Sequence, residues 1–194
     1  MSDSVLNPNI DSDNRPSLET DRCLLRPFLA SDAPTVQRLV NDIEIACMTR
    51  SIDYPYPEGA AEKWISRHVE YWQSGRCAIF AITVKRSGDL VGAVGLEIDE
   101  HDQIAELGYW IDKPQWNRGY ATEVSAIVLD FGFKQLGLNR IIAHHMLRNP
   151  ASGRVLEKIG MQREGTLRKH FRKWGRFYDV AIYGILKDDP GVAR

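Results

Sequence analysis

Four stretches of the chain have the residue pattern of helices. Within residues 61–72, apolar positions recur every three or four residues, which places them on one face of a helix. The last stretch has matching end signals, because Asn149 can cap it, Pro150 suits its first turn and Gly160 follows its end. Apolar spacing and end signals together predict helices at 31–42, 61–72, 119–136 and 149–160.

Seven other stretches have the apolar content of strands, bounded by turn residues. They are 22–28, 77–85, 90–98, 104–112, 140–147, 162–168 and 177–186. Short turns separate the second, third and fourth of them, which predicts an antiparallel meander. A helix then connects the meander to the fifth strand. This order predicts a mixed α+β domain in which a mostly antiparallel sheet of about seven strands has helices on both faces.

The length of 194 residues favours a single domain. We expect it over 18–187, between a flexible polar N-terminal tail at 1–17 and a C-terminal tail at 188–194. The apolar and charged fractions, 43% and 26%, are typical of globular proteins.

Composition argues against several classes of partner. The net charge of -1 provides no field that would recruit nucleic acid, and no apolar run approaches the roughly 18 residues of a membrane span. The N-terminal residues lack the apolar segment of a signal peptide, and the three cysteines form no CxxC pair, so we expect a cytoplasmic protein with reduced thiols. The histidines form no HExxH pattern, so we expect no metal.

The stretch 106–121, "ELGYWIDKPQWNRGYA", carries the first candidate chemistry. A strand runs through a turn containing Gly119 directly into a helix. The first turn of a helix has unpaired N–H groups and a partial positive charge, which together favour a bound anion. The stretch is neither a P-loop nor a GxGxxG motif. Taken alone, it is weak evidence for an anion site and favours an ordinary strand-to-helix turn, because Gly is common in turns.

Two segments together resemble the GNAT superfamily of acyl-CoA-dependent N-acetyltransferases. They are "ELGYWIDKPQWNRGYATEVSAIVLDFGF" and "NRIIAHHMLRNPASGRVLEKIGMQREG". The resemblance extends from Leu18 to Leu186 and is greatest to the branch of the Rim ribosomal-protein N-terminal acetyltransferases. It implies the acyl-CoA N-acyltransferase fold, whose sheet splays into a V. In the superfamily signature [QR]-x-x-G-x-[GA], this chain departs at the first position, where it has Trp116.

The resemblance implies acetyl-CoA as co-substrate and assigns residues to it. The pyrophosphate would be held by backbone N–H groups of the turn, at Asn117, Arg118, Gly119, Tyr120, Ala121 and Thr122. The pantetheine arm would lie along the strand end at Tyr109, Trp110 and Ile111 and would contact Asn149. Ser152 would face the sulfur.

Acetyl transfer to an amine needs a base that keeps the amine neutral, and two carboxylates are candidates. Glu106 alternates with apolar residues in its strand, on the side of Gly108 and Trp110. A paired structural carboxylate is the alternative interpretation of Glu106. Glu97, at the end of the preceding strand, is a second candidate acting through a water, or else a solvated strand end.

The departing sulfur needs a proton or a hydrogen bond. Related branches place a Tyr in the stretch after Ser152, but here that stretch is "RVLEKIG". Ser152 is therefore the candidate donor, as a hydrogen bond rather than a full proton, although the residues around it are also good helix-capping chemistry.

The acceptor amine is left open by the sequence: a protein N-terminus, a small amine, a polyamine or an aminoglycoside-like compound would fit. Trp64, Glu164 and Tyr178 are weak candidates for its site. His144 and His145 lie on the strand beside the splay, one on each side of the sheet. The basic run 168–176 is either a solvated hairpin loop or a grip on phosphates or an RNA-associated partner. The protein would be a monomer or a homodimer, and a non-catalytic acyl-CoA-binding protein is the alternative function.

Overall fold

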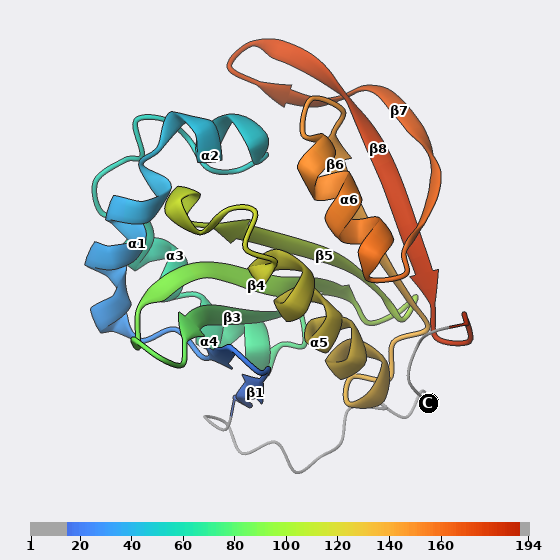
Figure 1. Cartoon of the computed structure of the whole chain (residues 1–194), viewed down its shortest axis with the longest axis horizontal. Helices are drawn as coiled ribbons and strands as arrows, with labels where there is room; N and C mark the ends of the chain where they lie inside the picture. The colour runs from blue at the N-terminus through green and yellow to red at the C-terminus, as the bar shows by residue number, and fades with distance from the viewer. Residues whose placement is uncertain (1–14, 191–194) are drawn as a thin grey trace.

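A computed structural model describes residues 15–190, and within them eight strands form one sheet, in the order β1-β2-β3-β4-β5-β6-β8-β7 (Figure 1). The strands are β1 (Leu18–Glu19), β2 (Cys23–Arg26), β3 (Cys77–Val84), β4 (Leu90–Asp99), β5 (Ile104–Ile111), β6 (Arg140–Met146), β7 (Gln162–Lys173) and β8 (Arg176–Leu186). The helices are α1 (Ala33–Val40), α2 (Ile43–Met48), α3 (Ala60–Ile65), α4 (His68–Gln73), α5 (Tyr120–Lys134) and α6 (Pro150–Lys158), with short 3-10 turns η1 (Ala30–Asp32) and η2 (Lys113–Gln115). The tails predicted at 1–17 and 188–194 lie largely outside the described residues.

One feature of the sheet creates the site: β5 and β6 are paired over only three positions. They run parallel, with Ile104 beside Arg140, Ala105 beside Ile141 and Glu106 beside Ile142. Beyond Glu106, β5 continues beside β4 and β6 continues beside β8, but the two no longer pair. The sheet therefore opens as a V whose vertex is at Glu106, which confirms the splayed sheet.

Helices cover both faces of the sheet, as expected (Figure 1). On one face, Val124 and Val128 of α5 and Leu156 of α6 are buried against strand residues that include Leu96 and Ile141. We call this the α5–α6 face. On the other face, α1 and α3 bury their apolar residues against β3 and β4, in a separate cluster that includes Val36, Ile65 and Ala93. We call this the α1–α4 face. None of the helices within residues 15–190 has the length and apolarity needed to cross a bilayer.

The helix predicted over 61–72 is instead two helices, α3 and α4. The break is at Ser66 and Arg67, where the Arg67 N–H donates to the Trp64 carbonyl three residues back, at 3.3 Å. The apolar spacing in the sequence continues across the break and conceals it, although α3 packs Ala61 and Ile65 on the α1–α4 face whereas Trp72 of α4 packs with the core cluster of the α5–α6 face.

The strand content is also larger than predicted. A two-residue strand, β1, makes the total eight instead of about seven, and it is too short for alternation to reveal. The basic run 168–176, expected as a loop, is mostly strand. Phe171 pairs with Tyr178 and Lys173 with Arg176, which leaves a two-residue turn at Trp174 and Gly175. Both turn residues have positive φ, 47° and 76°, as the tightest hairpin turns require.

Phe28, Trp64 and His68 form an aromatic cluster that joins α3 and α4 to the segment between β2 and η1. The ring of Trp64 is 5.0 Å from that of Phe28 and 4.4 Å from that of His68, both edge-on. His68 is 3% exposed, and its two ring nitrogens have no hydrogen-bond partner in the described part of the chain. Burial lowers the pKa of His68 to about 4, and the positive charge of Arg15 acts in the same direction. The imidazole is therefore neutral and packs in the core.

His68 makes the fold sensitive to acid. The unfolded chain binds a proton at His68 near pH 6.5 and the folded chain only near pH 4, so lowering the pH through this window favours unfolding. The expected loss is about 3 kcal/mol across the window. Urea unfolding of His68→Phe should show a flatter dependence on pH between 6.5 and 4 than the wild type. His101→Phe, at a side chain 95% exposed, is the control. Equal slopes for His68→Phe and wild type would contradict this assignment.

Candidate active site

The turn between β5 and α5 has the geometry of an anion site. Asn117 and Gly119 both have positive φ, 60° and 83°, so the chain reverses tightly before α5 begins at Tyr120. Gly119 is the N-cap and no side chain caps the helix, so the first-turn N–H groups are not taken by a side-chain acceptor. Trp116 donates its indole N–H to the Ile111 carbonyl at 2.7 Å. This bond ties the turn to the end of β5 and gives a structural reason for Trp at the departing signature position.

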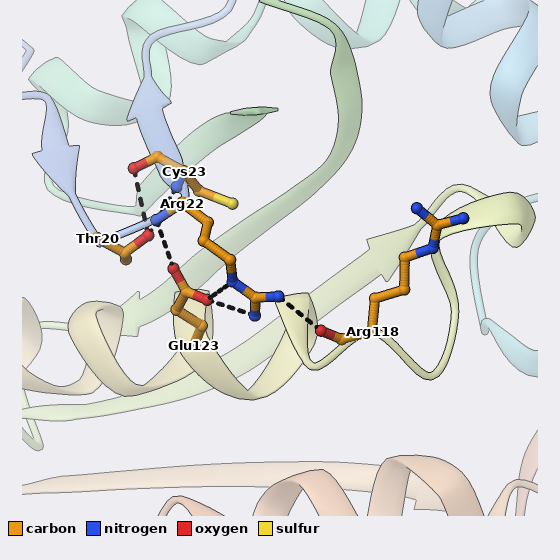
Figure 2. Close-up of polar contacts among 5 residues, drawn as sticks. All are labelled: Thr20, Arg22, Cys23, Arg118 and Glu123. Atoms are coloured by element: carbon orange, nitrogen blue, oxygen red, sulfur yellow. Dashed lines mark hydrogen bonds and ion pairs between the residues drawn. The ribbon is translucent and has the colours of Figure 1, made fainter. Parts of the chain in front are cut away.

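Arg22, which the sequence did not single out, braces this turn from the other end of the chain (Figure 2). Its Nε donates to Glu123 Oε2 at 2.6 Å, and its Nη1 donates to the Arg118 carbonyl at 2.8 Å. Its backbone N–H donates to Glu123 Oε1 at 3.0 Å, and its guanidinium lies 4.6 Å from the centre of the Tyr120 ring. Arg22 thus connects the turn to the first turn of α5.

The Arg22–Glu123 pair also removes a charge conflict. Burial would raise the pKa of Glu123, but hydrogen bonds from Thr20 and Arg22 hold it below its ordinary value, so the carboxylate is ionised. An ionised carboxylate in the first turn of α5 would repel a phosphate bound there. The guanidinium at 2.5 Å from Glu123 Oε2 compensates that charge.

The two sides of β5 serve different parts of the site. Ile111 is buried with Val124 and Val128 on the α5–α6 face, where Tyr109 also packs, whereas Trp110 packs on the α1–α4 face. Gly108 borders the open part of the V, and a Cβ there would meet no atom within 4 Å. The edge of β5 beyond Glu106 is therefore open toward β6 for a backbone-binding ligand.

A pair of hydroxyl groups spans the V on the α5–α6 face. Asn149 caps α6, because its Oδ1 accepts from the Ser152 N–H at 3.2 Å, as the sequence predicted. The Ser152 hydroxyl in turn lies 2.8 Å from the Tyr109 hydroxyl of β5. Burial raises the pKa of Tyr109 to about 12, with the Ser152 hydrogen bond opposing the shift, so the phenol stays protonated. Alternation placed Tyr109 on this side, but no sequence signal paired it with Ser152.

On the α1–α4 face, three ionisable side chains meet at the vertex. Glu106 Oε1 lies 2.9 Å from Nδ1 of His144, across the end of the β5–β6 pairing. The His144 side chain is 10% exposed and Glu106 is 40% exposed, so the carboxylate is open to the gap. Glu97 is directly opposite Glu106 in the β4–β5 register, on the same face. His145 points to the other face, where its ring lies 5.6 Å from that of Tyr183.

The weak acceptor candidates do not come together. Trp64 belongs to the aromatic cluster with Phe28, whereas Glu164 forms an ion pair with Arg140 at the closed end of the V. Tyr178 lies near the open end, where the Arg148 guanidinium is 4.5 Å from the centre of its ring. Within residues 15–190, no three His, Cys, Asp or Glu side chains gather as a metal site would require.

Comparison with known proteins decides the family, because a family model described as an acetyltransferase (GNAT) domain matches residues 22–162. The chain belongs to the GNAT acetyltransferase family. The uncharacterized N-acetyltransferase YoaA of Bacillus subtilis (strain 168) is 33% identical over 175 residues, 89% of this chain and 97% of YoaA.

Solved GNAT structures have the same fold. A GNAT acetyltransferase from Bacillus anthracis superposes with a TM-score of 0.80 at 26% identity, over 90% of this chain and all (100%) of that one. The RimL ribosomal L7/L12 α-N-protein acetyltransferase, in complex with coenzyme A, has a TM-score of 0.82 at 17% identity, over 92% and 100% of the two chains. As a GNAT enzyme, this protein is an acetyl-CoA-dependent acetyltransferase.

The residues of the turn fit a coenzyme A pyrophosphate. The helix start is uncapped, Gly119 permits close backbone approach, and Arg22 offsets the one carboxylate in the first turn. The backbone N–H groups from Asn117 to Thr122 would hold the pyrophosphate, and the edge of β5 would lie along the pantetheine arm.

Removing the Arg22 side-chain contacts should weaken the binding of acetyl-CoA more than it slows the chemical step. We expect Arg22→Met to raise the KM for acetyl-CoA about tenfold with a smaller change in kcat, because the turn loses a charge-assisted hydrogen bond and Glu123 loses its counter-charge. Initial rates of thiol release against acetyl-CoA concentration measure both constants. Lys85→Met is the matched control, since it removes an exposed ion pair with Glu19 that does not touch the turn. An unchanged KM in Arg22→Met would contradict the role of the brace.

Proposed function

We propose that this enzyme transfers the acetyl group of acetyl-CoA to a primary amine by direct attack in a ternary complex. The observation that carries the proposal is the arrangement around the V. A carboxylate–imidazole pair, Glu106 and His144, lies on the α1–α4 face at the vertex, and a hydroxyl pair, Tyr109 and Ser152, lies on the α5–α6 face. Such a site has a proton acceptor on one side of the gap and hydrogen-bond donors on the other.

Glu106 acts as the base in this proposal. It is partly exposed, it lies where the β5–β6 pairing ends, and the His144 ring orients its carboxylate. An amine arriving from the α1–α4 face loses a proton to Glu106, directly or through one water, and its nitrogen then attacks the thioester carbonyl. Glu97, the cross-strand neighbour, is the alternative base through a water.

The remaining needs of the reaction are met by the open strand edge and the hydroxyl pair. A backbone N–H of β5 beyond Glu106 polarises the carbonyl oxygen as negative charge develops on it. The Tyr109–Ser152 pair donates a hydrogen bond to the sulfur as the C–S bond breaks. The stretch after Ser152 has no Tyr, and that absence was the only support for a non-catalytic acyl-CoA-binding protein. The Tyr109 phenol, whose hydroxyl lies 2.8 Å from the Ser152 hydroxyl, supplies a phenolic donor from β5 and weakens that support.

The acceptor is a protein N-terminal α-amine, as the resemblance to the Rim branch implies, or a small-molecule amine. Of the three weak acceptor candidates, Tyr178 is best placed, because it lies at the open end of the V beside Arg148. Trp64 and Glu164 have packing or ion-pair partners, and their part in acceptor binding stays a prediction, as does a cytoplasmic location.

The base assignment is tested by Glu106→Gln, which preserves shape but removes the proton acceptor. We expect kcat to fall about 10²-fold with little change in the KM for acetyl-CoA. His144→Gln should give a smaller loss, because it disturbs only the orientation of the carboxylate. Thiol release across pH, with a panel of amines and N-terminal peptides, supplies the rates.

Glu97→Gln is the matched control for this test. A large loss in Glu97→Gln together with full activity in Glu106→Gln would move the base to Glu97. Full activity in both variants would leave solvent water as the proton acceptor and contradict the proposal.

The hydroxyl pair is tested by Tyr109→Phe and Ser152→Ala, separately and together. We expect each variant to lower kcat about tenfold, and the double variant to lose less than the product of the two, because the hydroxyls act as one unit. Circular dichroism checks that α6 is intact in Ser152→Ala, where the Asn149 cap accepts from a backbone N–H and is retained. Unchanged kcat in all three variants would exclude the pair from the chemistry.

A further inference from the structure

Helix α2 spans the open end of the V on the α1–α4 face (Figure 1). On the β5 side, Glu44 of α2 forms an ion pair with Lys113 of η2. On the β6 side, Arg148 donates to the Cys47 carbonyl, and Lys173 of β7 donates to the Thr49 carbonyl at 2.8 Å. These contacts fix α2 to both arms of the V, so an acceptor that reaches Glu106 passes residues at the C-terminal end of α2.

Three cations gather at this end. The Arg50 guanidinium lies 5.0 Å from the centre of the Phe171 ring, and Arg148 lies over Tyr178. Lys173 is 4% exposed, and burial lowers its pKa, which the charge of Asp53 opposes. We call Arg50, Arg148 and Lys173 the cationic cluster.

The cluster has an excess of positive charge. Among residues 15–190, no ion pair within salt-bridge distance joins any of the three to a carboxylate, and Asp53 is the acidic group that acts on Lys173. At the start of α2, the charge of Glu44 is paired with Lys113, whereas Asp42 caps the helix by accepting from the Glu44 N–H at 2.7 Å. The cluster therefore places three cationic side chains together with no carboxylate in salt-bridge contact within residues 15–190.

A chain of contacts connects the cluster to the proposed base. The Phe171 ring beneath Arg50 lies 6.0 Å from the His144 ring, and His144 contacts Glu106. Arg50 and Arg148 rest on aromatic rings, which orients each guanidinium while leaving N–H donors for an oxyanion. The geometry points to an acceptor whose amine reaches Glu106 while an anionic group on the same molecule meets Arg50 and Arg148. We propose that the acceptor is an acidic peptide N-terminus and that polyamines are poor acceptors. This inference rests on the proposed function.

The test compares N-terminal peptides of equal length that begin with Ser and continue with three Glu, three Gln or three Lys, with spermidine as a further acceptor. Thiol release gives kcat/KM for each. Fluorescence anisotropy of labelled peptides with coenzyme A present gives binding without turnover. We expect the Glu peptide to exceed the Gln peptide about tenfold in kcat/KM at low salt, and Arg50→Gln to abolish most of that preference.

Two variants sharpen the test. Arg50→Lys keeps the charge and loses the guanidinium fork, so it should retain part of the preference. Arg172→Gln is the matched control: it lies on the same hairpin, adjacent to Lys173, but on the opposite side of β7, with its guanidinium 5.9 Å from the Phe177 ring. It should leave the preference unchanged.

The outcomes separate this inference from the proposed function. Turnover of Gln or Lys peptides, or of spermidine, at least as fast as the Glu peptide would keep the transferase and overturn the acidic acceptor. Arg50-dependent binding of the Glu peptide without turnover of any acceptor would support the cluster and contradict the proposed function. If Arg50→Gln weakened the binding of acetyl-CoA and not that of the peptide, Arg50 would belong to the co-substrate site and the inference would be overturned. The absence of any peptide binding would overturn it as well.

Discussion

The short parallel pairing of β5 with β6 is the constraint on which the site depends. Three paired positions are enough to hold the two halves of the sheet together, and they end at Glu106. Beyond them β5 still pairs with β4 and β6 with β8. Opening the gap therefore leaves unpaired only the backbone N–H and C=O groups that face it. Those groups remain unmatched by the other strand and are available to a ligand that runs like a further strand.

The V also sorts the chemistry by face. Strand alternation sends Glu106 and His144 to one side of the sheet and Tyr109 to the other, and the cap of α6 brings Ser152 to Tyr109. The brace from Arg22 acts at the turn rather than at the gap. It fixes the start of α5, where the pyrophosphate is expected, and compensates the negative charge of Glu123 there.

Local patterns predicted most of the elements, because alternation, helical spacing and caps act over a few residues. The meander, the Asn149 cap and the two faces of β5 follow directly from such patterns. The break between α3 and α4 was missed since the apolar period continues through it. The strand pairing within the hairpin at 168–176 was missed since its charges obscured an alternation with buried Phe171 and Lys173. The contacts that define the site join residues far apart: 101 positions separate Arg22 from Glu123, 43 separate Tyr109 from Ser152, and 38 separate Glu106 from His144. No local pattern encodes such pairs, so only the resemblance to GNAT enzymes drew attention to part of them.

The central claim is that transfer takes place in the gap, between a base on one face and hydroxyl donors on the other. A crystal structure with a bisubstrate analogue, in which coenzyme A is linked through its sulfur to an N-terminal peptide amine, tests it most directly. The account predicts the sulfur within hydrogen-bonding distance of the Tyr109 or Ser152 hydroxyl, and the amine nitrogen on the Glu106 side, directly or through one water. A sulfur outside the V, or an amine nitrogen on the α5–α6 face away from Glu106, would contradict it.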